Sequence, residues 1–150
     1  MAISAIFGCA ALALRASNIT IPIGGPFVID ARGIPGVVGA ALSGPVGGLI
    51  IGFLAGVSAQ ILLIDIPSFM IAYFVVGLLA NMLSRFKWLS ALGGLTGYPI
   101  AAFIAWQMSL FPNFYTSIGF LAPRMVVVLV QLIVLYIIFK RYPSILDLIK

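Results

Sequence analysis

The sequence predicts an all-α integral membrane protein: a compact bundle of six transmembrane helices, with five as the alternative count. Composition is the first reason, because 63% of the residues are hydrophobic, mean hydropathy is +1.27 and only 7% are charged. A soluble domain carries about 25% charged residues. The second reason is a run from Gly33 to Ile64 without a charged residue. At about 20 residues per span, residues 1–150 form a single transmembrane domain with no room for a soluble one.

The first helix is expected over Ala2–Ala16, an apolar and short segment. Its small residues Ala5, Cys9 and Ala13 are four apart, so they line one face of a helix. In lipid, such a face lets another helix approach closely. We expect this face to pack against a neighbouring helix of the same chain or against a partner subunit.

The segment Ser17–Gly33 is expected to be a loop, because its prolines and glycines between positions 22 and 26 break helices. The alternating Ile19, Ile21 and Ile23 argue against disorder. Long loops are usually functional or disordered. We therefore expect an ordered loop that folds onto the bundle.

A second helix is expected over Ile34–Leu42 and a third over Pro45–Gln60, separated by a turn at Ser43–Pro45. Glycines recur here at every fourth position, so they form one stripe along a helix. Such a stripe predicts one unusually tight helix contact, inside the bundle or with a partner. The glycines of the stripe are Gly44, Gly48, Gly52 and Gly56.

The fourth helix is expected over Ser68–Leu83, after a turn that contains Asp65. The fifth is expected over Leu89–Met108, bent by its glycines. A second unusual loop, Leu110–Pro123, precedes a sixth helix over Pro123–Phe139.

Basic residues mark the sides of the membrane. Arg85 and Lys87 lie between the fourth and fifth helices, and Lys140 and Arg141 follow the sixth. Cytoplasmic loops are rich in Lys and Arg, so both clusters are predicted to be cytoplasmic. The chain is then a multi-pass protein of the cell membrane with both termini inside, and the loops 17–33, 60–67 and 110–123 share the outer face. The scattered charges favour the lipid bilayer as partner and exclude nucleic acid.

Several kinds of chemistry are absent from the sequence. It has no His and no Glu, and Cys9 is its single cysteine. Neither a catalytic constellation nor a metal-ligand cluster nor a phosphate-binding glycine loop is present. We therefore expect no enzyme, no catalytic residue, no metal site and no cofactor.

Polar and aromatic residues toward the outer face instead predict a site for a small-molecule substrate. Apolar walls with a few convergent polar groups are typical of such sites, and Gln60 and Gln107 are costly in lipid unless they face a cavity or a partner. The candidate ligand-binding residues are Asn18, Thr20, Phe27, Asp30, Arg32, Gln60, Asp65, Trp106, Gln107, Asn113, Tyr115 and Arg124.

Each of these candidates has a simpler alternative. Asp30 and Arg32 form either a local ion pair or helix-end contact, or else they contact a ligand or latch the loop. Asp65 either caps the fourth helix or lies deeper as a functional group. Arg124 either anchors to lipid or meets an anionic ligand. The aromatic residues form either an interfacial belt or a stacking wall.

Two stretches resemble a known family: Asp30-Ala-Arg-Gly-Ile-Pro35, and Leu42-Ser-Gly-Pro-Val-Gly-Gly-Leu-Ile-Ile-Gly52. They look like the second and third helices of the substrate-binding S components of energy-coupling factor (ECF) vitamin transporters. The resemblance implies a six-helix bundle that binds a vitamin or similar micronutrient under its first outer loop. It also implies two kinds of partner, a transmembrane coupling subunit that grips helices 1 to 3 and two cytosolic ATPases.

Two other classes remain open at this point. The same stretches are similar to the membrane input domain of LytS-type sensor histidine kinases, which predicts a dimer. A small scaffold subunit of a larger membrane complex is the third class, and it would have a filled core without a ligand cavity.

Overall fold

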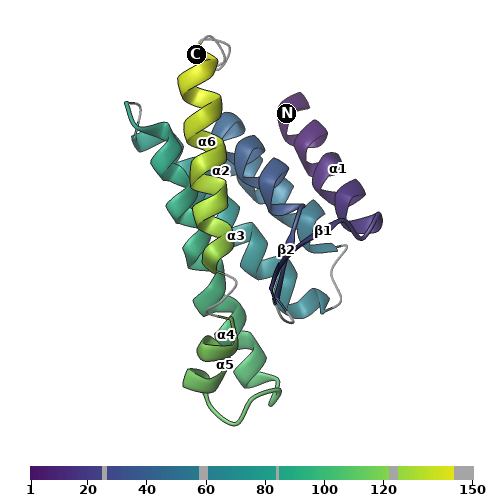
Figure 1. The fold of residues 1–150 in the computed structure, drawn as a ribbon. Helices are drawn as coiled ribbons and strands as arrows, with labels where there is room; N and C mark the ends of the chain where they lie inside the picture. The colour runs from purple at the N-terminus through teal and green to yellow at the C-terminus, as the bar shows by residue number, and fades with distance from the viewer. Residues whose placement is uncertain (25–26, 58–60, 84, 122–124, 144–150) are drawn as a thin grey trace.

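The computed structural model describes residues 1–24, 27–57, 61–83, 85–121 and 125–143. These residues fold into a bundle of helices with a small two-stranded antiparallel sheet (Figure 1). In chain order the elements are α1 (Ala2–Ala16), β1 (Thr20–Gly24), β2 (Phe27–Asp30), α2 (Gly33–Val57), α3 (Leu62–Met82), the 3₁₀ helix η1 (Lys87–Thr96), α4 (Gly97–Gln107), α5 (Phe114–Leu121) and α6 (Val126–Arg141).

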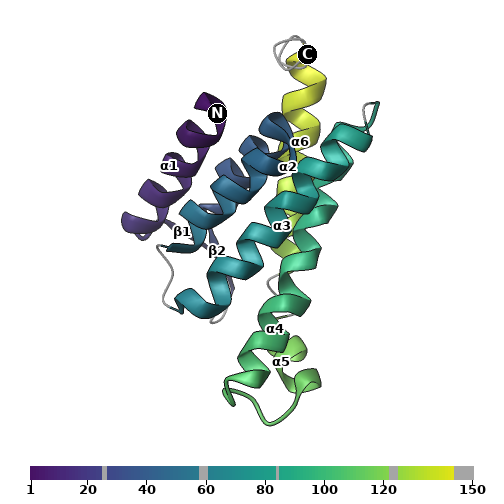
Figure 2. The same ribbon diagram turned by 180° about the vertical axis from the view of Figure 1, so that it is seen from behind.

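The two ends of the bundle differ in what they carry. α1 begins and α6 ends at the same end, where α3 also passes into η1 (Figures 1 and 2). The β1–β2 hairpin and the α4–α5 connection lie toward the opposite end. The first long loop therefore lies away from the end of α6, as the predicted topology requires.

Judged by length and composition, three helical stretches among the described residues could cross a membrane: Gly33–Val57, Leu62–Met82 and Lys87–Gln107. α1 is apolar but shorter. The membrane class predicted from composition agrees with these lengths. The count of six spans remains a prediction.

α2 is two helical segments joined by a sharp reversal at Gly44. This residue has φ 73° and ψ −171°, a conformation that glycine adopts without steric cost. Arg32 Nη1 donates a hydrogen bond of 2.8 Å to the carbonyl of Ala55. In a straight helix these residues would be about 35 Å apart. The chain therefore folds back at the turn predicted over Ser43–Pro45. The 25 residues of Gly33–Val57 are thus the summed length of two segments, and neither segment alone has the ~20 residues that a straight spanning helix needs.

The glycine stripe packs against the backbone of α3. A Cβ added at Gly52 would lie 2.5 Å from the Cα of Met70, and one at Gly56 would lie 2.6 Å from the Cα of Ile66. Added side chains at these positions would collide with main-chain atoms, which cannot move aside. The stripe therefore lets two antiparallel segments of one chain approach closely.

The packing face of α1 differs from the predicted one. Its buried residues are Ser4, Gly8 and Ala11, and a Cβ at Gly8 would meet the side chain of Leu54 on α2. The residues predicted to face a neighbouring helix, Ala5, Cys9 and Ala13, are exposed. The expected contact within the chain is therefore wrong, because a helix turns about 100° per residue and the adjacent face carries the closest contacts. Docking to a partner remains a prediction for this face.

Two element boundaries also correct the sequence interpretation. α3 begins at Leu62 with Ile61 as its N-cap, so Asp65 is not the cap that the sequence suggested. Asp65 lies in the first turn, where the positive end of the helix dipole favours a carboxylate. The expected fifth helix begins at Lys87 and runs as a 3₁₀ helix before it becomes α4.

The predicted loop 110–123 was also wrong, because it contains α5. Asn113 begins this helix: its Oδ1 accepts hydrogen bonds from the backbone N–H of Thr116 at 2.9 Å and from the Thr116 hydroxyl at 3.0 Å. An Asn at this position is a favoured N-cap. The Ser117 hydroxyl then joins α5 to α4 through the carbonyl of Ala102, at 2.9 Å.

Candidate functional site

The candidate site lies at the base of the β1–β2 hairpin. Thr20 pairs with Asp30 and Ile21 with Ile29, so the isoleucine alternation noted in the sequence belongs to a strand. Just before β1, Asn18 has φ 53°, and its N–H donates to the carbonyl of Arg15 at 2.9 Å. Asn tolerates this left-handed conformation after a helix. The role of Asn18 in the structure is therefore to end α1.

Asp30 joins the hairpin to two helices. Its Oδ1 accepts the backbone N–H of Arg32 at 3.0 Å. Its Oδ2 lies 2.8 Å from Arg32 Nε and 3.6 Å from Nη1 of Arg15, the last basic residue of α1. The Nε contact is short but outside hydrogen-bond geometry, so it is an ion pair only. Asp30 thus latches the end of β2 to α1 and to the start of α2.

Arg32 is buried, with 7% of its surface exposed. Three contacts compensate its charge: the Asp30 carboxylate, the carbonyl of Ala55 at 2.8 Å, and the ring of Phe69, whose centroid lies 4.4 Å from Cζ. Ala55 lies near the C-terminal end of α2, where the helix dipole favours a cation. Arg32 therefore ties both ends of α2 together.

Two further polar side chains are buried against the first turns of α2, which follow Arg32 in the sequence. Tyr73 is 2% exposed, and its hydroxyl has no hydrogen-bond partner among the described residues. A Cβ added at Gly36 would collide with the Tyr73 ring and hydroxyl, so the phenol lies directly on α2. Gln131 of α6 is 5% exposed and donates to the carbonyl of Gly33 at 3.0 Å. We call Arg32, Phe69, Tyr73 and Gln131 the Arg32 cluster.

The polar groups of the Arg32 cluster are hydrogen-bonding groups. It combines a guanidinium, a phenol hydroxyl and an amide inside apolar helices. Among the described residues, no group of three His, Cys, Asp or Glu side chains could hold a metal ion. The cluster can therefore bind polar groups of a ligand and offers nothing for metal chemistry.

The structure brings together only part of the predicted site. Asp30 and Arg32 meet at the hairpin, whereas a second group lies on or beside α4 and α5, apart from the hairpin in both views (Figures 1 and 2). This second group is exposed and consists of Trp106, Gln107, Asn113 and Tyr115.

In the second group, the ring centroids of Trp106 and Phe114 are 6.2 Å apart, and Tyr115 is 84% exposed. This exposure fits an interfacial belt better than a stacking wall. Gln60 and Arg124 lie outside the described residues, as do the side chains of Thr20 and Phe27.

Sequence reasoning missed Tyr73, Phe69, Gln131 and the pairing of Arg15. The signal for Gln131 was present, because a lone amide inside an apolar helix needs a partner, the argument applied to Gln60 and Gln107. The hydroxyl of Tyr73 in an apolar run carries the same signal.

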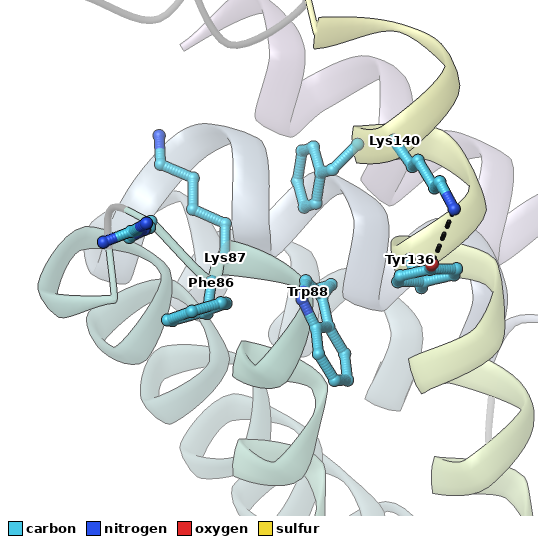
Figure 3. Close-up of a pocket in the computed structure, with 7 residues that line it drawn as sticks. Phe86, Lys87, Trp88, Tyr136 and Lys140 are labelled. Atoms are coloured by element: carbon cyan, nitrogen blue, oxygen red, sulfur yellow. Dashed lines mark hydrogen bonds between the residues drawn. The ribbon is translucent and has the colours of Figure 1, made fainter.

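The two pockets described in the structure lie elsewhere. One, of about 260 Å³, lies between the start of η1 and the end of α6 (Figure 3). The other, of about 200 Å³, is apolar and includes Tyr98 of α4, Ile118 of α5 and Met125. No member of the Arg32 cluster lines either pocket.

Comparison with known proteins gives no further guide. No protein-family model matches the chain, and no match was found among curated proteins or solved structures.

Proposed function

We propose that the chain is the substrate-binding S component of an ECF-type importer. In this role it captures a vitamin or similar small micronutrient beneath the β1–β2 hairpin. The supporting observation is the Asp30 latch, which holds the hairpin to α1 and α2 beside a buried cluster that contains the unpartnered Tyr73 hydroxyl. A buried hydroxyl without a partner costs about 1–3 kcal/mol. A ligand that hydrogen-bonds to Tyr73 would offset that cost, and release of the latch would admit it.

The arrangement of the bundle is consistent with this role. The hairpin lies away from the end where α1 begins and α6 ends (Figure 1). The face formed by Ala5, Cys9 and Ala13 is exposed and presents small side chains. On this proposal a transmembrane coupling subunit docks there, and two cytosolic ATPases supply the energy.

Mass spectrometry of small molecules that co-purify with the full chain tests the proposal. We expect one retained compound, and we expect Tyr73→Phe to weaken its binding up to about ten-fold, since one neutral hydrogen bond contributes about 0.5–1.5 kcal/mol. Thermal stability should not fall, because the removed hydroxyl has no described partner. Tyr115→Phe, on the exposed α5, is the matched control and should bind normally. Retention of no compound, or equal binding by both variants, would contradict the proposal.

A scaffold subunit is the second candidate, and one observation favours it. The buried core consists largely of close-packed alanine, valine and glycine, and neither described pocket reaches the Arg32 cluster. A scaffold would retain no small molecule yet would co-purify in fixed ratio with another membrane subunit. The same purification therefore separates the two candidates.

A further inference from the structure

A second feature, independent of the hairpin, is the 260 Å³ pocket at the opposite end of the bundle (Figure 3). Its walls come from Arg85 and Phe86, from the start of η1 and from the last turns of α6. Three of its lining residues are cations: Arg85, Lys87 and Lys140. Its volume is below the ~300–1,000 Å³ that pockets for drug-sized ligands occupy, so it suits a small group.

The positive charge of this pocket is uncompensated by the described residues. None of its lining residues carries a carboxylate. The described ion pairs join Asp30 to Arg15 and Arg32. Asp65 lies in the first turn of α3, most of a 21-residue helix away from the pocket, which is roughly 25 Å. An anion in the pocket would therefore lie among cationic lining residues, with no described acidic group nearby. In Figure 3 the Lys87 side chain points away from Lys140, so the Lys140 ammonium beside Tyr136 is the cation that we expect to contact the anion.

Aromatic side chains hold part of the pocket in place. The rings of Trp88 and Tyr136 meet edge to face with centroids 5.6 Å apart, which joins η1 to α6. Phe139 is buried beside them, at 8% exposed. Lys140 Nζ donates to the Tyr136 hydroxyl oxygen at 2.9 Å, as Figure 3 shows. The ammonium is thus oriented, and two of its three donor hydrogens remain for a ligand.

The rim of the pocket is apolar and exposed. Phe86 is 51% exposed and Tyr136 42%. Ile137, which follows Tyr136 on α6 but does not line the pocket, is 52% exposed. Exposed aromatic residues and long basic side chains occur together at the interface between lipid and water. Basic pockets between helices on the cytoplasmic side bind phosphate-bearing lipid head groups. We propose that this pocket binds the phosphate of an anionic phospholipid, whose acyl chains lie along the exposed face of α6.

Native mass spectrometry of the full chain in detergent tests this assignment, with dioleoyl-phosphatidylglycerol and dioleoyl-phosphatidylcholine as probes. We expect the anionic lipid to bind more tightly. Lys140→Gln should weaken it about five-fold, the loss expected for one cation near a membrane surface. Arg141→Gln is the matched control, because Arg141 is the next residue, is exposed and does not line the pocket. Equal losses in both variants, or equal affinity for the two lipids, would overturn the proposal.

A competition experiment separates lipid from free anion. Glycerol 3-phosphate at millimolar concentration should leave the bound phosphatidylglycerol in place, and displacement would identify a site for soluble phosphate instead. Lys140→Arg keeps the charge and should retain the lipid, so a loss there would contradict the role of charge. Tyr136→Phe keeps the ring but removes the acceptor that orients Lys140, so it should cost less than Lys140→Gln.

Discussion

Asp30 is the residue on which the hairpin depends. Its carboxylate contacts Arg32 at 2.8 Å and Arg15 at 3.6 Å, so one side chain holds β2, α1 and α2 together. The two contacts differ in their contribution to stability, because Arg32 is buried whereas Arg15 remains partly exposed. Removal of the partner of a buried charge costs more than loss of an exposed pair.

Asp30→Asn should therefore lower the free energy of unfolding by about 2–3 kcal/mol, below the 3–5 kcal/mol of a fully buried pair because Asp30 is 27% exposed. Thermal unfolding in detergent measures the loss, and amide exchange should rise over residues 20–30. Arg15→Gln is the control and should cost about 1 kcal/mol or less. Similar losses in the two variants would show that Asp30 does not act through Arg32.

Some residues of the site were predictable from the sequence and others were not, for a physical reason. Asp30 and Arg32 were predictable because they are charges in a nearly uncharged sequence, two positions apart at a helix start. For Tyr73 and Gln131 the sequence showed that each polar group needs a partner but not which one, because their contacts with Gly36 and Gly33 depend on how α3 and α6 pack on α2. Asn18 and Asn113 were assigned to a ligand, whereas backbone geometry at helix ends explains both.

At the scale of elements, the contact between α2 and α3 depends on missing side chains. Gly52→Ala places a methyl group 2.5 Å from the Cα of Met70, so the two backbones must separate. We expect a loss of about 1–3 kcal/mol in stability, the usual cost of overpacking. Gly119→Ala in α5 is the control, because its Cβ would meet nothing within 4 Å. The control should be neutral or stabilising by up to ~1 kcal/mol, and an equal effect of both on thermal unfolding would contradict a tight contact.

α5 is a short helix whose start depends on one side chain. Asn113→Ala removes the acceptor of the Thr116 N–H and should cost about 1 kcal/mol. Amide exchange over residues 114–121 measures the fraying locally. Asn113→Asp keeps the acceptor and should leave exchange nearly unchanged, so fraying in both variants would indicate another cause.

Elements were predictable where one residue type dictates the backbone. The turn at Ser43–Pro45 followed from a glycine before a proline, and Gly44 has the positive φ that this turn requires. The predicted start of the fourth helix after Asp65 was wrong because Pro67 was interpreted as an early-helix residue. α3 in fact begins at Leu62 and continues through Pro67. The prediction of the packing face of α1 was wrong because two adjacent faces both carry small residues. Only the tertiary contacts with α2 determine which of them is buried.

At the scale of the whole molecule, the distribution of charge sets the topology. One end of the bundle holds the passage from α3 to η1 and the last turn of α6. It carries Arg85, Lys87, Lys140 and Arg141, so this end should face the cytoplasm. The hairpin and the α4–α5 connection lie toward the other end (Figures 1 and 2). The hairpin can admit an external substrate only if this other end faces the outside of the cell.

Single cysteines in a Cys9→Ala background test this topology, since Cys9 is the only cysteine. A maleimide that cannot cross the membrane should label Ser17→Cys and Ser109→Cys in intact cells. It should label Tyr142→Cys only after the membrane is opened. All three positions are exposed, and none removes a charge, so the orientation is left undisturbed. Labelling of Ser17→Cys and Tyr142→Cys from the same side would contradict the topology and with it the capture of a substrate beneath the hairpin.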